Sequence, residues 1–120
     1  MNDQLTIKIS LPSEIERFTP GDSASGRRAE TLIKNDRLRV VLITMRSGAE
    51  LAEHSAPGPI TIHALQGRFT VRHGVSSDDL DAGHLIALDE GVRHAVHAVE
   101  DGAFLLTIGW SETPSPEPTR

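Results

Sequence analysis

The sequence predicts an all-β domain, and three observations lead to this prediction. Between residues 38 and 110, short apolar segments alternate with turns that contain Gly, Asp and Pro. These segments are too short for helices, and their many β-branched residues favour strands. Six such segments in about 75 residues are typical of a β-sandwich or β-barrel.

The six expected strands follow one another along this stretch. They span residues 39–45, 60–65, 68–73, 84–88, 94–99 and 104–110. In segments 40–43 and 103–106 both alternating faces are apolar, so we expect these two strands to be covered on both sides. The second cover is either another layer of the same chain, such as a folded-back N-terminal strand, or a second subunit.

Two extensions flank the expected barrel of residues 38–110. Residues 1–37 form an N-terminal extension, with a possible short strand at 5–9, a helix start at 12–16 and a turn-rich stretch at 19–26. Residues 111–120 contain three prolines and no apolar side chain. This composition predicts a disordered, Pro-rich tail.

Composition excludes several classes of protein. A chain of 120 residues fits one domain, and the absence of cysteine excludes disulfides, thiolate nucleophiles and Cys-bound metals. That absence suits a reducing interior, so we expect a cytoplasmic protein. A net charge of −5 and 3% aromatic residues argue against nucleic acid as a partner. No apolar run approaches the ~18 residues of a membrane span.

Six residues occur at fixed spacings in two stretches: Gly48, His54 and Gly67 in the first, and Gly83, Gly91 and His94 in the second. In these spacings the sequence resembles the two motifs of the cupin superfamily, G-x5-H-x-H-x3-E-x6-G and G-x5-P-x-G-x2-H-x3-N. The resemblance covers residues 38–110. It implies a cupin-type jelly-roll β-barrel, commonly dimeric, with a pocket in its mouth. The glycines fall at strand ends, where tight turns need positive φ or no side chain.

The sequence departs from both motifs. Ala56 stands at the second histidine position and Ile60 at the glutamate position, so two of the four usual metal ligands are missing. Asp89 replaces the proline, which still suits a turn, and Ala98 replaces the asparagine. Catalytic zinc and iron sites generally keep three protein ligands, and two imidazoles alone bind a metal weakly.

His54 and His94 are the candidate site residues. They are expected to point into the barrel mouth, as remaining ligands of a divalent metal (Fe, Mn, Zn or Ni) or as hydrogen-bonding groups for a small molecule. Glu50 is the candidate third ligand, because it shares the parity of His54 if that segment is extended. His94 lies between Val92 and Val96 on one strand face, and apolar surroundings favour its neutral form.

Apolar residues are expected to form the rest of the pocket. Ile60, Ile62 and Ala64 share one parity, and apolar pockets with a few polar groups are the usual small-molecule sites. The remaining histidines are expected elsewhere: His63 and His97 on outward faces, and His73 and His84 in solvated turns.

These observations predict a small cupin barrel that binds a small organic molecule and forms a homodimer. The sequence leaves open whether the protein is an enzyme. The alternative is a metal-dependent dioxygenase, isomerase or decarboxylase that uses His54 and His94. A third hypothesis is a non-catalytic interaction module. The fold cannot choose among them, because one fold carries many functions.

Overall fold

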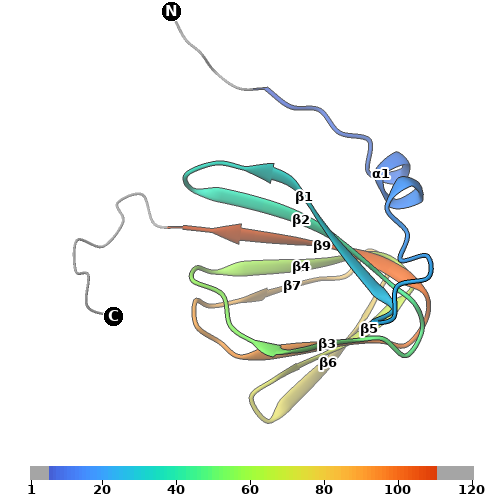
Figure 1. The fold of residues 1–120 in the computed structure, drawn as a ribbon. Helices are drawn as coiled ribbons and strands as arrows, with labels where there is room; N and C mark the ends of the chain where they lie inside the picture. Colours follow the sequence, from blue (N-terminus) through green and yellow to red (C-terminus); the bar gives the residue numbers. More distant parts are fainter. Residues whose placement is uncertain (1–5, 111–120) are drawn as a thin grey trace, which may run out of the picture.

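The computed structural model describes residues 6–110. This part of the chain forms one helix and nine strands (Figure 1). The elements are α1 (Leu11–Arg17), β1 (Arg27–Lys34), β2 (Leu38–Met45), β3 (Glu50–His54), β4 (Ile60–Gln66), β5 (Arg68–His73), β6 (Ser76–Asp81), β7 (Leu85–Leu88), β8 (His94–Ala98) and β9 (Gly102–Gly109).

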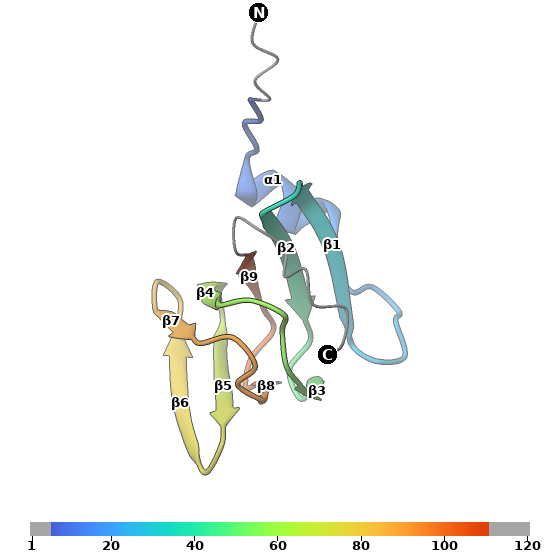
Figure 2. The ribbon, with the colours of Figure 1, turned by 90° about the vertical axis from the view of Figure 1, so that its left-hand side faces the viewer.

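The strands form two antiparallel sheets that pack as two layers (Figures 1 and 2). The larger sheet has the order β1-β2-β9-β4-β7, and the smaller one has the order β3-β8-β5-β6. The chain passes from one sheet to the other between β2 and β3, β3 and β4, β4 and β5, β6 and β7, β7 and β8, and β8 and β9. This arrangement is the all-β jelly roll that the sequence predicts.

The two ends of the barrel differ in their connections. The β1–β2 turn and the loops that join β3 to β4 and β7 to β8 lie together at one end, which we call the mouth (left in Figure 1). The connections from β2 to β3, from β4 to β5 and from β8 to β9 lie at the opposite end, which we call the base.

An aromatic pair lies in the core toward the base. Phe69 and Phe104 meet there edge to face, with ring centroids 5.1 Å apart, and both side chains are fully buried. Such aromatic pairs add to the stabilisation that their buried area provides. Around them lie small and medium apolar side chains from both sheets, including Met45, Ala64, Val71, Val96 and Ala98.

Two turns at the base press backbone against backbone. Gly67 has φ +79°, and a Cβ there would lie 2.4 Å from the carbonyl oxygen of Asp101. A Cβ on Gly102 would lie 2.2 Å from the carbonyl oxygen of Gln66. Glycine is therefore required at Gly67 for space as well as for conformation. The expectation of tight turns at the motif glycines is confirmed, since Gly48, Gly67, Gly83 and Gly91 all have positive φ.

All six predicted strands are present, and the helix expected near residues 12–16 is α1. Three further strands, β1, β3 and β6, were not expected. The boundary placed at residue 38 is wrong, because β1 pairs with β2 along its length and so belongs to the barrel. Residues 6–10 form no strand, which corrects the strand expected at 5–9 over those positions. The tail predicted at 111–120 lies outside the described residues.

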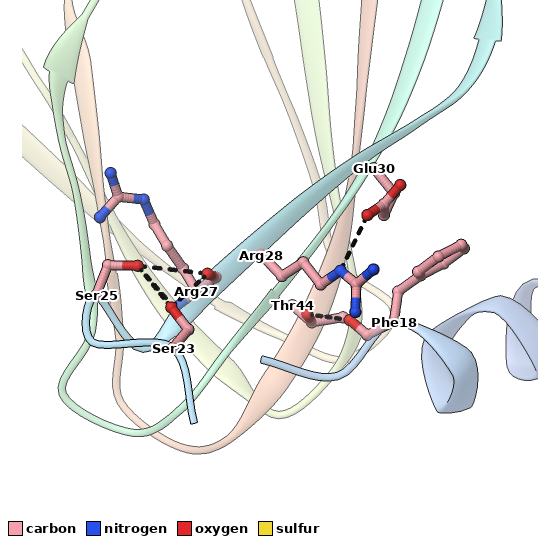
Figure 3. A network of polar contacts seen from close by, with 7 residues as sticks. All are labelled: Phe18, Ser23, Ser25, Arg27, Arg28, Glu30 and Thr44. Atoms are coloured by element: carbon pink, nitrogen blue, oxygen red, sulfur yellow. Dashed lines mark hydrogen bonds and ion pairs between the residues drawn. The ribbon is translucent and has the colours of Figure 1, made fainter. Parts of the chain in front are cut away.

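The N-terminal segment covers part of the outer face of the larger sheet. The hydroxyl of Thr44, which is buried on that face, donates a hydrogen bond to the carbonyl of Phe18 at 2.6 Å (Figure 3). Arg28 lies 4.8 Å from the centroid of the Phe18 ring and pairs with Glu30 at 2.9 Å. The chain therefore supplies some of the second cover expected for 40–43. Over residues 6–110, no helix is long and apolar enough to span a membrane.

Candidate functional site

His54 and His94 lie side by side on neighbouring strands. They are direct cross-strand partners of β3 and β8, and their ring centroids are 4.2 Å apart with the planes tilted by 58°. Only five residues join His54 to β4, and five join β7 to His94, so both imidazoles lie at the mouth. The structure thus brings the two candidate histidines together.

Backbone hydrogen bonds select the tautomer of both rings. Nδ1 of His54 lies 2.8 Å from the carbonyl oxygen of Ala52, and Nδ1 of His94 lies 3.0 Å from that of Val92. A carbonyl oxygen only accepts, so each Nδ1 carries a proton and donates it. In the neutral ring, Nε2 then keeps a lone pair. Neither Nε2 has a hydrogen-bond partner among the described residues.

His94 is held in its neutral form. Its side chain is 2% exposed, and burial lowers its pKa from the ordinary value of 6.5. The hydrogen bond to the Val92 carbonyl opposes this effect, and repulsion from His54 adds to it. Near neutral pH the buried ring is therefore uncharged, as the sequence predicts, and its Nε2 can accept a hydrogen bond or coordinate a metal.

A β-bulge corrects the expectation for Glu50. The register of β3 shifts between Leu51 and His54, so these two residues face the barrel interior although three positions separate them. Glu50 consequently lies on the outer face, where its Oε2 is 2.6 Å from Nδ1 of His97. The parity argument that placed Glu50 beside His54 is wrong, because it assumed a regular strand.

His73 is the residue that sequence reasoning missed. It pairs with His94 from the other side, so the histidines of β3, β8 and β5 form one cross-strand row. Its Nε2 lies 2.7 Å from Oδ2 of Asp78, and its side chain is 23% exposed. The signal was present, since His73 shares the parity of the apolar Phe69 and Val71.

The other histidines lie where the sequence placed them. His63 and His97 face outward, because their neighbours in the same strands are core residues. His84 is exposed in the turn after β6, where its Nδ1 accepts a hydrogen bond from the backbone N–H of Asp81. None of these three belongs to the row at the mouth.

Ile60, Ile62 and Ala64 are inward-facing core residues, with 3%, 1% and 0% exposure. Ile60 is the one nearest the mouth. It also borders a cavity of about 290 Å³, but this cavity is lined mainly by outward-facing residues of the larger sheet, such as Leu38, Thr61 and Thr107, and not by His54 or His94. Ile62 and Ala64 lie progressively deeper, toward the Phe69–Phe104 contact. Of the three expected lining residues, Ile60 therefore lies at the same end of the barrel as the two histidines.

The described residues do not supply a complete set of metal ligands. Within 6–110, no three His, Cys, Asp or Glu side chains converge in a geometry that could hold a metal ion. His54 and His94 offer two Nε2 atoms, whereas His73 is bonded to Asp78 and Glu50 is bonded to His97. The side chains present therefore do not fit a site that needs three protein ligands.

Comparison with known proteins identifies the fold. No family model matches the sequence, and no curated protein matches it. Among solved structures, a conserved protein of unknown function from Streptococcus pyogenes is similar, with 24% identity over 76% of this chain and 80% of that one, at a TM-score of 0.69.

Two cupins give the same result. An RmlC-like cupin from Shewanella frigidimarina has 22% identity over 79% of this chain and 91% of its own, at a TM-score of 0.68. An RmlC-like cupin from Desulfovibrio desulfuricans has 26% identity over 69% and 81%, at a TM-score of 0.65. The protein has the fold of a small cupin barrel, as the two motifs imply.

Proposed function

We propose that this protein binds a small organic molecule in the barrel mouth, with His54 and His94 as paired hydrogen-bond acceptors. The observation that supports this function is the close approach of the two rings, each of which is hydrogen-bonded to the backbone through Nδ1. Both Nδ1 atoms are tied to backbone carbonyls, which leaves two adjacent Nε2 lone pairs at the same end of the barrel. A molecule with hydroxyl or N–H donors can use both.

The surroundings of the pair suit such a ligand. His94 is buried and neutral, and the inward-facing, buried Ile60 lies at the same end of the barrel in the opposite sheet. A polar acceptor in low-polarity surroundings gains more from a hydrogen bond than the same acceptor in water, because it loses less solvation. The tautomers are already fixed, so binding requires no proton rearrangement.

Nitrogen-15 NMR of the histidine rings tests this function. We expect spectra of the free protein to show both rings with the proton on Nδ1, and a library of polyols, amides and acids to contain ligands that shift both Nε2 signals. His54→Ala and His94→Ala should each weaken binding at least tenfold. His63→Ala, which removes an outward-facing imidazole, is the matched control. Ligands that bind all three variants equally would contradict the proposal.

A metal-dependent enzyme is the second candidate, favoured by the same two Nε2 atoms. A divalent ion held there would need its remaining ligands from water or substrate, and it would polarise a substrate oxygen. Elemental analysis of protein purified without chelators tests this, together with calorimetric titration of Fe²⁺, Mn²⁺, Zn²⁺ and Ni²⁺. One equivalent that is lost in both His→Ala variants would establish the metal site, and millimolar binding or none would reject it.

We propose a second copy of this chain as the protein partner. Leu85 is 62% exposed on β7, an edge strand of the larger sheet, and an apolar side chain there favours burial against another surface. Light scattering should give the mass of a dimer for the parent. Leu85→Lys should shift it toward the monomer, whereas Val75→Lys, in the exposed β5–β6 turn, should not. A monomeric parent would reject the homodimer.

A further inference from the structure

A cationic side chain lies inside the same end of the barrel. Arg39 is near the start of β2, on the face that also carries Val41, Ile43 and Met45. Arg39 is the cross-strand partner of Ile108 in β9, and Ile108 is the partner of Ile60 in β4. These three residues therefore form one row across the larger sheet, on its inward face and near the mouth. The histidine row occupies the corresponding position in the smaller sheet.

Arg39 has no polar partner. Its Nε is buried and unpaired, and no ion pair or hydrogen bond joins its guanidinium to another group in the described part of the chain. The exposed carboxylates of the mouth loops, Asp36, Asp89 and Glu90, do not pair with it. A buried donor that lacks an acceptor is costly, and an arginine keeps its charge at any pH a protein tolerates.

An aromatic ring holds the guanidinium in place. The charged carbon of Arg39 lies 5.1 Å from the centroid of the Trp110 ring, and the backbone N–H of Trp110 donates to the carbonyl of Arg37 at 3.0 Å. Cation–π contact fixes the position of the charge without neutralising it. The guanidinium therefore keeps its capacity to form a charge-assisted hydrogen bond with an anion.

We propose that Arg39 is an anion-binding residue and that the ligand of this barrel is a small organic carboxylate. This inference rests on the proposed function and specifies its ligand class. The carboxylate pairs with Arg39 on the larger sheet, and donor groups elsewhere on the ligand reach the Nε2 atoms of His54 and His94 on the smaller sheet. Face-to-face sheets lie ~10 Å apart, a gap that a small hydroxy acid can span.

The chain contains its own reporter for this site. Trp110 is the only tryptophan, and the sequence has no tyrosine. Fluorescence excited at the red edge of tryptophan absorption therefore reports the ring that contacts Arg39. The probes are the hydroxy acids gluconate and lactate, each compared with an uncharged counterpart: glucose and lactamide. We expect at least one carboxylate to change the fluorescence saturably and its counterpart to bind at least tenfold more weakly.

Three variants identify the residue responsible. Arg39→Met should weaken carboxylate binding at least tenfold. Arg39→Lys, which keeps the charge but loses the planar fork, should fall between the parent and Arg39→Met. Arg72→Met removes one positive charge from the outer face of the smaller sheet and should bind like the parent. Urea denaturation of each variant shows whether it is folded.

The outcomes separate this inference from the proposed function. If uncharged compounds bind as well as the acids and depend on His54 and His94 but not on Arg39, the barrel binds a neutral molecule and the inference is wrong. If Arg39→Met and Arg72→Met weaken binding equally, the effect is one of net charge, which also overturns it. If no probe binds the parent but other library compounds need both histidines, only the carboxylate assignment fails.

Discussion

The base and the mouth of the barrel are built from opposite ends of the same strands, yet they differ in the side chains that they bring together. At the base, the buried rings of Phe69 and Phe104 contact each other edge to face, and glycines at Gly67 and Gly102 let the backbones of two turns approach closely. At the mouth, two Nε2 atoms and one guanidinium lack partners within the described chain. We therefore expect stability to be concentrated at the base, whereas the polar groups that could bind the proposed ligand lie at the mouth.

The largest expected effect is at the base. Phe104→Ala removes a fully buried ring and its contact with Phe69, so we expect the free energy of unfolding to fall by ~3–5 kcal/mol. Urea denaturation followed by circular dichroism measures this loss. His63→Ala, on the outer face of the neighbouring strand, should cost far less. Equal losses would mean that the base is not where stability is concentrated.

The base turn offers a finer test. Gly67→Ala and Gly83→Ala both place a side chain at positive φ, which costs ~1–2 kcal/mol, but only at Gly67 would the new Cβ meet a backbone oxygen, at 2.4 Å. Around Gly83 there is open space. We therefore expect Gly67→Ala to lower the thermal midpoint clearly more than Gly83→Ala. Identical midpoints would show that the close contact relaxes without cost.

At the mouth, the buried imidazole of His94 should make the free energy of unfolding depend on pH in the acid range. The pKa of His94 is lowered by burial, so the unfolded chain takes up a proton first as pH falls below 6.5. Its contribution to stability is therefore complete above that pH and is lost progressively below it, by at most about 1.4 kcal/mol per pH unit. Urea titrations at several pH values should show a smaller acid slope for His94→Gln than for the parent. An unchanged acid slope in His94→Gln would contradict this expectation.

The smallest expected change in stability is at the mouth, at Arg39. Arg39→Met replaces an unpaired buried donor with an apolar side chain of similar length, a change that is often neutral or stabilising. We expect the free energy of unfolding to stay within about 1 kcal/mol of the parent. A loss as large as that of Phe104→Ala would mean that Arg39 supports the fold, and the contrast between the two ends would fail.

Strand periodicity in the sequence located six of the nine strands. Motif spacing singled out His54 and His94, which the structure places side by side as cross-strand partners. The strands that were not expected have polar faces: Ser76–Asp81 is almost wholly polar, and its pairing with Arg68–His73 depends on the neighbouring strand rather than on its own pattern.

The remaining site residues depend on details that periodicity does not encode. The face of Glu50 was wrongly assigned because one extra residue in a strand inverts every assignment beyond it. His73 was placed in a turn because it precedes Gly74, although the strand includes it. Arg39 begins an apolar strand and looks like a solvated end residue, and only the packing of Trp110 and the burial of Nε distinguish it.

The bulge in β3 affects both the register of the strand and the position of the proton on the His54 ring. Its extra residue lets Leu51 and His54 both face inward, and the carbonyl of Ala52, which lies within the bulge, holds the proton of His54 on Nδ1. A change in chain length at this position would therefore alter which nitrogen of the His54 ring carries the proton, without substituting the ring itself.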